Sequence, residues 1–398
     1  MPIATGRRDQ WAVVVEATVG TLVACVAADI VRTLGGSANR AFQPIENLIS
    51  EERKNTLGLD ALIRYASAPG EFDFTTYLKL SGTAGTPIAA GYRACLKGTY
   101  GRETVTGGTS VVYEHLRIDT DTRLSYSMFK KFGATGSLMV LQLAGCFFNM
   151  MDVAIRKRGQ ESLLQCKFTG PFMRRYWAGY ATCTTGSTTT AVILNAGQAK
   201  FFSAGAFITV TGVTPNPVQI TSINYATDTL TVPTLSGAPG SGVVVQGWFP
   251  TAGADTAHII SGWRGVGTLG GVTFPHREID YHLDNKIVVV DDIRNGSQYP
   301  SDYNEGEDWR EVTMRVNHYL GSSLVGGMEA YYDADQEIQK AISIPVGDVA
   351  GRIATFAGPK LQNLDSPSED TSGRITVERS YRLLETSTGN DESSLSLT

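Results

Sequence analysis

The sequence predicts a mainly β protein in which antiparallel strands form two tandem sandwich or barrel-forming modules, with short flanking helices and a small inserted all-β domain. Three observations predict this fold class. The 398 residues include 43 glycines, which suits an architecture with many turns. Strand-length segments that follow one another along the chain alternate apolar and polar side chains. A stretch from Cys183 to Trp248 carries only two charged residues, Lys200 and Asp228.

The clearest strand is Glu71–Leu80, where Phe72 and Phe74 begin an apolar face at period two. Two helices are predicted, at Pro87–Lys97 and at Gly326–Glu337. Further strands are predicted at Ser110–Leu116, Arg123–Phe129, Asp152–Arg158, Glu161–Phe168, Arg174–Tyr180, His258–Arg264, Lys286–Asp291, Arg310–Tyr319, Gln339–Ile344 and Gly373–Leu384.

The two halves of the chain have a similar order of elements. In each, a strand leads through a Gly/Ser-containing loop to a helix, then to a strand, an Ala-Gly turn and a last strand. The Ala-Gly turns are predicted at Leu143–Gly145 and Phe356–Gly358. We interpret this order as a tandem duplication. The alternative is that β proteins of this composition repeat such patterns by chance.

The nearly uncharged stretch predicts a separate small β domain, because its segments AVILNAG, FITVTGV, VQITSINY and TLTVPTL alternate between turn residues. The predicted boundaries are 1–180 for the first module with an N-terminal arm, 181–252 for the insert, and 253–398 for the second module with a C-terminal tail. A host that tolerates such an insert offers a solvent-facing loop. Trp248 and Trp263 flank the insert and are expected to pack at the domain junction.

The composition favours a globular protein without a basic surface that binds nucleic acid. Hydrophobic residues make up 42% of the chain and the formal net charge is −5. The five cysteines form no CxxC pair, so we expect buried free thiols, as in a reducing cytoplasm. No apolar run is long enough for a membrane span, and no membrane association is predicted.

No catalytic motif is present, since the chain lacks GxSxG, HExxH, a Walker loop and a GxGxxG that opens a helix. We therefore predict no enzyme, no catalytic residue, no cofactor and no metal. Alternation places His276, Glu278, Asp280, His282 and Asp284 on one side of an extended segment. A metal site is conceivable there, but solvated strand residues explain the pattern better.

An acidic loop at Ser301–Glu311 resembles a calcium loop only in part, and a solvated acidic loop explains it better. A short basic run, Arg156–Arg158, offers a complementary charge. We expect these two segments to pair between subunits. The candidate inter-subunit residues are Arg156, Lys157, Arg158, Asp302, Glu305, Glu307 and Asp308.

The segment from Phe42 to Trp177 resembles the major tail tube proteins of long-tailed, non-contractile bacteriophages. The resemblance rests on FQPIENLISEERKNTLG, on EFDFTTYLKLSGTAGTPIAAGYRACLKGTYG and on LQLAGCFFNMMDVAIRKRGQESLLQCKFTG. The closing TVERSYRLLETSTGNDESSLSLT is similar to the end of that family's chains. These are loose patterns that cover most of the chain outside the insert.

The resemblance implies an antiparallel sandwich that assembles into rings whose inner strands close into one barrel. Stacked rings would form the tail tube, through which double-stranded DNA passes without specific binding. Two tandem modules would let three copies make a pseudo-sixfold ring, whereas a single module would need a hexamer. Other tail proteins (tape measure, terminator and distal tail) would be further partners. The protein would reside in the virion tail after assembly in the host cytoplasm.

The strands at 71–80 and 309–320 are the predicted lining of the bore, whose inner residues must be polar because the lumen is wet. The candidate lumen-facing residues are Asp73, Thr75, Tyr77 and Lys79. Phe42–Leu57 and Gly389–Thr398 are candidate arms that become ordered on stacking.

Two other classes of function remain open. A surface-binding module would use the insert as an adhesin or glycan-binding domain. A hydrolase would use His276 or His282 with Asp280.

Overall fold

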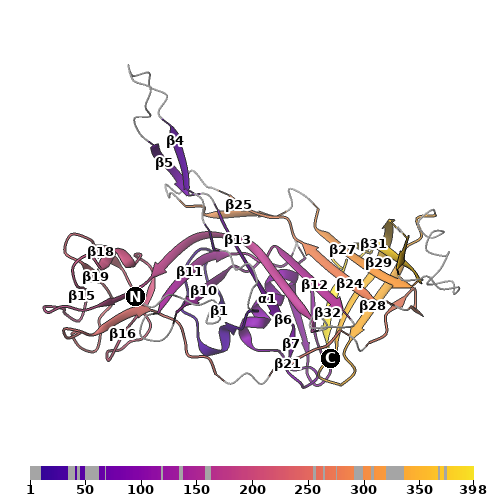
Figure 1. Cartoon of the computed structure of the whole chain (residues 1–398), viewed down its shortest axis with the longest axis horizontal. Helices are drawn as coiled ribbons and strands as arrows, with labels where there is room; N and C mark the ends of the chain where they lie inside the picture. Colours follow the sequence, from indigo (N-terminus) through magenta and orange to yellow (C-terminus); the bar gives the residue numbers. More distant parts are fainter. Residues whose placement is uncertain are drawn as a thin grey trace, which may run out of the picture.

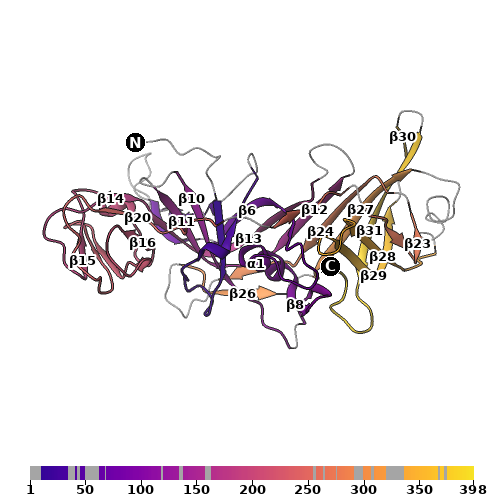
Figure 2. The same ribbon diagram turned by 90° about the horizontal axis from the view of Figure 1, so that it is seen from below.

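The computed structural model describes residues 10–34, 41–42, 45–49, 62–67, 69–117, 120–133, 138–156, 163–253, 257–262, 265–274, 276–290, 299–305, 309–319, 336–365, 368–371 and 374–398. The molecule is elongated (Figure 1). The insert lies at one end, the first half of the chain in the middle and the second half at the other end. The turned view in Figure 2 shows the same order.

The first half of the chain contains the helix and the longest strand. Its elements are β1 Gln10–Val15, η2 Ala27–Asp29, β2 Ile30–Val31, β3 Ala41–Phe42, β4 Ile45–Ile49, β5 Leu62–Ser67, β6 Gly70–Tyr77, β7 Lys79–Leu80, α1 Ala90–Tyr100, β8 Gly101–Thr106, β9 Ser110–His115, β10 Tyr126–Phe132, β11 Met139–Cys146, β12 Met150–Arg156 and β13 Gln165–Ala178.

The insert contributes short strands, and the second half contributes the remaining long ones. The insert holds β14 Tyr180–Thr182, β15 Ala191–Ile193, η4 Ala199–Phe201, β16 Phe207–Val210, β17 Val218–Gln219, β18 Ser222–Asn224, β19 Thr229–Thr231 and β20 Val244–Gly247. The second half holds β21 His258–Ile259, β22 Thr268–Leu269, β23 Val272–Thr273, β24 Glu278–Asp284, β25 Ile287–Val290, β26 Asp302–Glu305, β27 Glu311–Tyr319, β28 Lys340–Val346, β29 Ala354–Asp365, β30 Ser368–Thr371, β31 Arg374–Leu384 and β32 Ser394–Leu397.

The predicted fold class is confirmed, because the described chain is mainly β and its sheets are antiparallel. The predicted helix at Pro87–Lys97 is observed as α1, which starts and ends three residues later. The two strands predicted at Glu161–Phe168 and Arg174–Tyr180 are largely one strand, β13. The helix predicted at Gly326–Glu337 falls, but for its last two residues, outside the described residues.

Both Ala-Gly turn predictions are wrong, since these residues lie inside strands. Leu143–Gly145 belongs to β11 and Phe356–Gly358 belongs to β29. Each motif sits next to a register shift, one between β10 and β11 and one between β28 and β29. The backbone of Gly145 has φ +64°, a left-handed conformation that a glycine adopts without strain. A bulge therefore replaces the expected turn in both halves.

Strand pairing repeats between the halves. In the first half, β10 pairs with β11, β11 with β13, and β13 with β6. In the second half, β28 pairs with β29, β29 with β31, and β31 with β27. The elements before them also correspond, because β3 pairs with β6 as β24 pairs with β27. In the sequence, the hairpin β4–β5 lies between β3 and β6, and the hairpin β25–β26 lies between β24 and β27.

The insert folds into two small sheets that share a hydrophobic cluster with the first half. The sheets have the orders β14-β20-β16-β17 and β15-β19-β18. The shared cluster joins insert residues such as Ile208 and Val245 to Phe129 on β10 and Val140 on β11. Trp248 donates from Nε1 to the carbonyl of Cys25 at 3.1 Å, which fastens the end of the insert to the first module. Trp263 lies outside the described residues.

The C-terminal residues are part of the fold of a single chain. Strand β32 pairs with β29 on one side and with β9 on the other. The Ser393 hydroxyl lies 2.8 Å from His115 Nε2 and 2.7 Å from the Tyr281 hydroxyl, in a buried network. The expectation that Gly389–Thr398 becomes ordered only on stacking is therefore wrong for β32, since this strand is already paired on both edges.

Candidate functional site

One sheet runs without interruption across both halves of the chain. Its strand order is β6-β13-β12-β24-β27-β31. At one end of the sheet, β3 pairs with β6. At the other end, β30 and the last residues of β29 pair with β31. The strands β12 and β24 make the joint between the halves, from Met150 opposite Asp284 to Arg156 opposite Glu278. Figure 1 shows these strands side by side from β13 to β31.

The two faces of this sheet differ in chemistry. One face is apolar and fully covered, and it carries Phe72, Phe74, Phe168, Met151, Val153, Ile279, Tyr281, Met314, Val316 and Tyr381. The other face is polar and mostly half-buried or exposed. One row of cross-strand neighbours on it consists of Thr75, Lys167, Asp152, His282, Thr313 and Arg382. A second row consists of Tyr77, Gln165, Ala154, Asp280, Arg315 and Ser380.

Several charges on the polar face are paired within the chain. Asp152 Oδ1 lies 2.6 Å from His282 Nδ1, and this hydrogen bond is the main cause that raises the pKa of His282. Arg315 Nε lies 3.2 Å from Glu378 Oε1.

Arg156, predicted to pair between subunits, is engaged within the chain at the joint. Its guanidinium donates to Asp280 Oδ1 at 2.5 Å and to the carbonyl of Ile279 at 3.1 Å, across the β12–β24 pair. Glu305 is likewise engaged within the chain, because Arg123 Nε donates to its carboxylate at 2.7 Å. Asp302 is exposed. The other candidates, Lys157, Arg158, Glu307 and Asp308, lie outside the described residues.

The predicted lumen-facing residues divide into two groups. Thr75 and Tyr77 lie half-buried on the polar face, and Phe72, Phe74, Thr76 and Leu78 are buried on the opposite side as predicted. Asp73 and Lys79 are each only 6% exposed, so neither offers its charge to solvent in the single chain.

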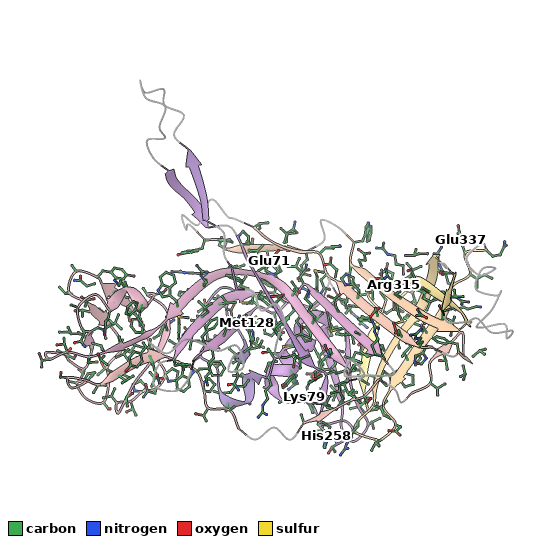
Figure 3. All side chains as sticks on the ribbon, viewed as in Figure 1. Glu71, Lys79, Met128, His258, Arg315 and Glu337 are labelled. Carbon is green, nitrogen blue, oxygen red and sulfur yellow. The ribbon has the colours of Figure 1, made fainter. Side chains whose placement is uncertain are left out.

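Lys79 departs from the pattern because β6 ends at Tyr77 and the alternation does not continue into β7. Its ammonium lies 4.9 Å from the ring centroid of Tyr92 on α1. In Figure 3, Lys79 lies near His258 and away from Arg315 on the sheet. Burial against the helix thus removes Lys79 from the polar face.

The residues considered for metal binding do not form a metal site. His282 pairs with Asp152, while buried His276 packs against the ring of Phe274 at 5.6 Å between centroids. In the part of the chain that the structure describes, no group of three or more His, Cys, Asp or Glu side chains is placed to hold a metal ion. For the calcium-like loop, Gly306 and Asp308 fall outside that part. All five cysteines are buried and free, as predicted.

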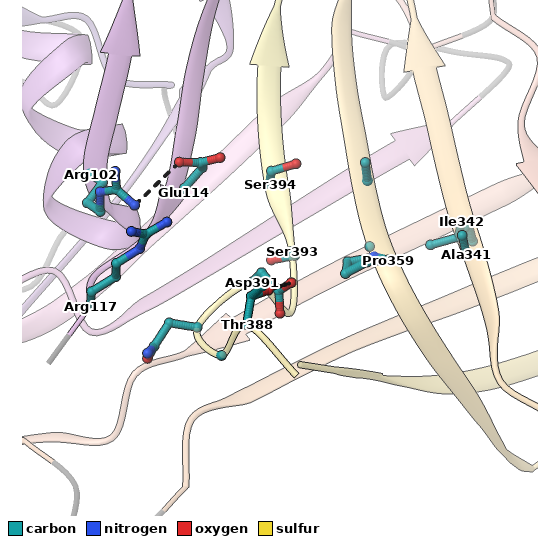
Figure 4. A pocket seen from close by; sticks show the side chains of 14 residues that line it. Arg102, Glu114, Arg117, Ala341, Ile342, Pro359, Thr388, Asp391, Ser393 and Ser394 are labelled. Atoms are coloured by element: carbon teal, nitrogen blue, oxygen red, sulfur yellow. Dashed lines mark hydrogen bonds and ion pairs between the residues drawn. The ribbon is translucent and has the colours of Figure 1, made fainter. Parts of the chain in front are cut away.

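A cavity of about 400 Å³ opens between the two halves, beside β9 and β29 (Figure 4). It is lined by Arg102, Glu114, Arg117 and the loop that leads to β32. Arg102 is engaged with Glu114 at 3.6 Å and with Asp121 at 3.4 Å. No histidine or cysteine is among the described residues that line the cavity, but Ser393 lines it and its hydroxyl lies 2.8 Å from Nε2 of the buried His115.

The two ends of the continuous sheet are the notable feature that the sequence did not reveal. Among the described residues, β3 pairs only with β6 and β30 only with β31. By the internal repeat, β3 corresponds to β24 and β30 corresponds to the end of β12. The strands β12 and β24 pair with each other at the joint between the halves. Leu364, at the bulge just before β30, is 60% exposed.

No family model matches the chain, and no curated protein matches it. Among the described residues, no helix has the length and apolar character that crossing a membrane requires.

Proposed function

We propose that this chain is a structural subunit that assembles with copies of itself into rings, and that the rings stack into a phage tail tube. One observation carries the proposal: the chain joins its own two halves through β12 and β24, and the continuous sheet ends in the corresponding strands β30 and β3, whose outer edges have no partner strand among the described residues. An exposed strand edge is a template for pairing with another chain. The internal joint supports pairing of β30 with β3 of another copy.

The expected contact between copies repeats the internal joint. The end of β29 and β30 of one copy would pair with β3 of the next, antiparallel, as β12 pairs with β24. Such a head-to-tail interface closes into a ring when the rotation from one copy to the next is a whole-number fraction of a full turn. Because each chain carries two repeats, three copies give six equivalent joints, which favours the trimeric ring over the hexamer.

A ring of this kind would close the polar face around a bore. The polar face suits a wet lumen, and its compensated ion pairs would let double-stranded DNA pass without specific binding. The proposal includes a place in the virion tail, assembly in the host cytoplasm, and contacts with the tape measure, terminator and distal tail proteins. It includes no enzymatic role.

The proposal is tested with purified chain by light scattering and negative-stain microscopy. We expect rings with the mass of three copies, and stacks of rings at higher concentration. Leu364→Lys should prevent ring closure, because a lysine would stand where β3 of the next copy covers the edge. Val349→Lys is the matched control, since Val349 is also exposed but lies in a loop away from both edges. A wild-type chain that stays monomeric at all concentrations would overturn the proposal.

A second candidate function, glycan binding at the insert, has one observation in its favour. Trp177 and Tyr180 at the junction and Tyr225 on the insert are exposed aromatic side chains. Sugars stack on such rings. Binding of the monomer to a glycan array, lost in Tyr225→Ala, would support this alternative.

A further inference from the structure

Two hairpins occupy the same place in the internal repeat but have different surroundings. The hairpin β25–β26 connects β24 to β27, and the hairpin β4–β5 connects β3 to β6. The spacing is the same, since β24 ends at Asp284 and β25 begins at Ile287, while β3 ends at Phe42 and β4 begins at Ile45.

The second hairpin lies on the first module, across the boundary between the halves. Ile287 and Val289 of β25 are buried against Phe147 and Met173. The ring of Tyr303 on β26 lies 4.5 Å from that of Phe147. Figure 1 shows β25 crossing beside β13. A hairpin from one repeat thus covers the end of the sheet of the preceding repeat.

Polar contacts fix the same docking. The backbone N–H of Ile287 donates to Asn149 Oδ1 at 2.7 Å, and Arg123 donates to Glu305 at the other strand of the hairpin. Arg123 is itself buried. A buried charge that is paired in this way specifies position as well as adding stability.

The backbone of the first hairpin is placed differently. In Figure 1, β4 and β5 project away from the rest of the molecule. The only strand partners described for β4 and β5 are each other. A lone two-stranded hairpin is marginally stable in water. Its sequence is nevertheless rich in apolar residues, and the register places Leu48 opposite Ile63 and Ile49 opposite Leu62.

We infer that β4–β5 docks on the second module of another copy of this chain, as β25–β26 docks on the first module of its own. The inference rests on the proposed ring. The seat on the chain's own first module is already filled by β25–β26. By the internal repeat, the equivalent seat on the second module lies where Lys360 in the middle of β29 pairs with Leu384 at the end of β31.

The test compares one substitution in each hairpin. Leu48→Asp places a charge at a register position of β4 opposite Ile63, and Val289→Asp does the same on β25 opposite Tyr303. We expect Val289→Asp to lower the melting temperature of the free chain, because Val289 is buried within it. Leu48→Asp should leave that temperature unchanged and raise the concentration needed for ring formation at least about tenfold. Replacing 45–67 by a short Gly-Ser linker should have the same effect.

Each other outcome contradicts the inference in a distinguishable way. If the wild type forms rings and Leu48→Asp forms them at the same concentration, the hairpin does not join neighbours, although the ring proposal stands. If Leu48→Asp forms single rings normally but no stacks, the hairpin joins stacked rings instead. If Leu48→Asp lowers the melting temperature of the free chain as Val289→Asp does, the hairpin docks on its own chain. If the wild type forms no rings, both the inference and the proposed function fail.

Discussion

His282 and Asp152 face each other across the two strands that join the halves of the chain, with 2.6 Å between Nδ1 and Oδ1. The two residues come from different repeats and are 130 positions apart in the sequence. Protonation of the imidazole strengthens this pairing, since the hydrogen bond with Asp152 is the main cause that raises the pKa of His282. The joint is therefore one place in this molecule where pH acts on the fold.

The chain is expected to lose stability as pH rises through the pKa of His282. The hydrogen bond with Asp152 raises this pKa above its ordinary value, and Asp284 and Glu311 add to the effect. A raised pKa means that the contribution is complete below the unfolded-state value of about 6.5 and is lost as pH passes the folded value. Because both side chains are partly exposed, we expect less than about 1 kcal/mol.

Denaturant unfolding at about pH 5.5 and about pH 8.5 checks this, with His282→Gln for comparison. The variant should show a flatter change of unfolding free energy with pH than the wild type. Equal pH dependence in both proteins would contradict the prediction.

Arg156 and Asp280 are expected to be coupled in stability. The guanidinium of Arg156 is half-buried and donates to Asp280 across the joint. A double-mutant cycle with Arg156→Ala and Asp280→Ala should give a coupling of about 0.5–1 kcal/mol in the free chain. Additive single effects would show instead that this pair contributes nothing to the joint.

Replacement of Gly145 by alanine should be strongly destabilising. The residue has φ +64°, and an added Cβ would come within 2.6 Å of Met173 Cγ. The backbone strain and the overlap together predict a loss of about 2–4 kcal/mol in unfolding free energy. Gly107→Ala is the matched control, because a Cβ added there would meet no atom within 4 Å and no such strain applies. A small effect of Gly145→Ala would show that the bulge can rearrange.

Glu16 is expected to be more important for stability than carboxylates at the surface. Its buried carboxylate accepts hydrogen bonds from Ser125 Oγ, Ser127 Oγ and the backbone N–H groups of Gly20 and Gly145. Burial raises its pKa, while these four donors act in the opposite direction. Glu16→Gln turns an acceptor into a donor in this cage and should cost about 1–3 kcal/mol.

The control for Glu16 is Glu114→Gln, because the side chain of Glu114 is 42% exposed and its ion pair with Arg102 is 3.6 Å long. Thermal unfolding of both variants measures the difference. Similar melting temperatures would contradict the assigned role of the four donors.

Removal of residues 183–248 should leave ring assembly intact but weaken the free chain. The insert lies at the end of the molecule away from the joint and from β30 (Figure 2). It also shares a hydrophobic cluster with Phe129, Val140 and Ala144, which its deletion would expose. We expect a lower melting temperature together with rings of the usual mass in micrographs. Loss of rings in a chain that remains folded would place the insert in the interface.

The sequence by itself determined the class of fold and much of its local pattern. Alternation at Glu71–Leu80 predicted the buried row from Phe72 to Leu78, because side chains of a strand point to opposite faces in turn. Similar element order predicted two repeats, and strand pairing follows the same order in both. The insert's lack of charge predicted its separate small sheets. Local preferences suffice for such features, since each depends on neighbours within a few residues.

Only the tertiary structure decided which charges are available and which edges are open. Lys79 and Arg156 have ordinary polar patterns in sequence, yet one lies over Tyr92 and the other closes the joint on Asp280. The Ala-Gly motifs could not be assigned to bulges, because a bulge is defined by its partner strand. The correspondence of β12–β24 with the open edges of β30 and β3 likewise depends on strand pairing between distant segments, which no local pattern specifies.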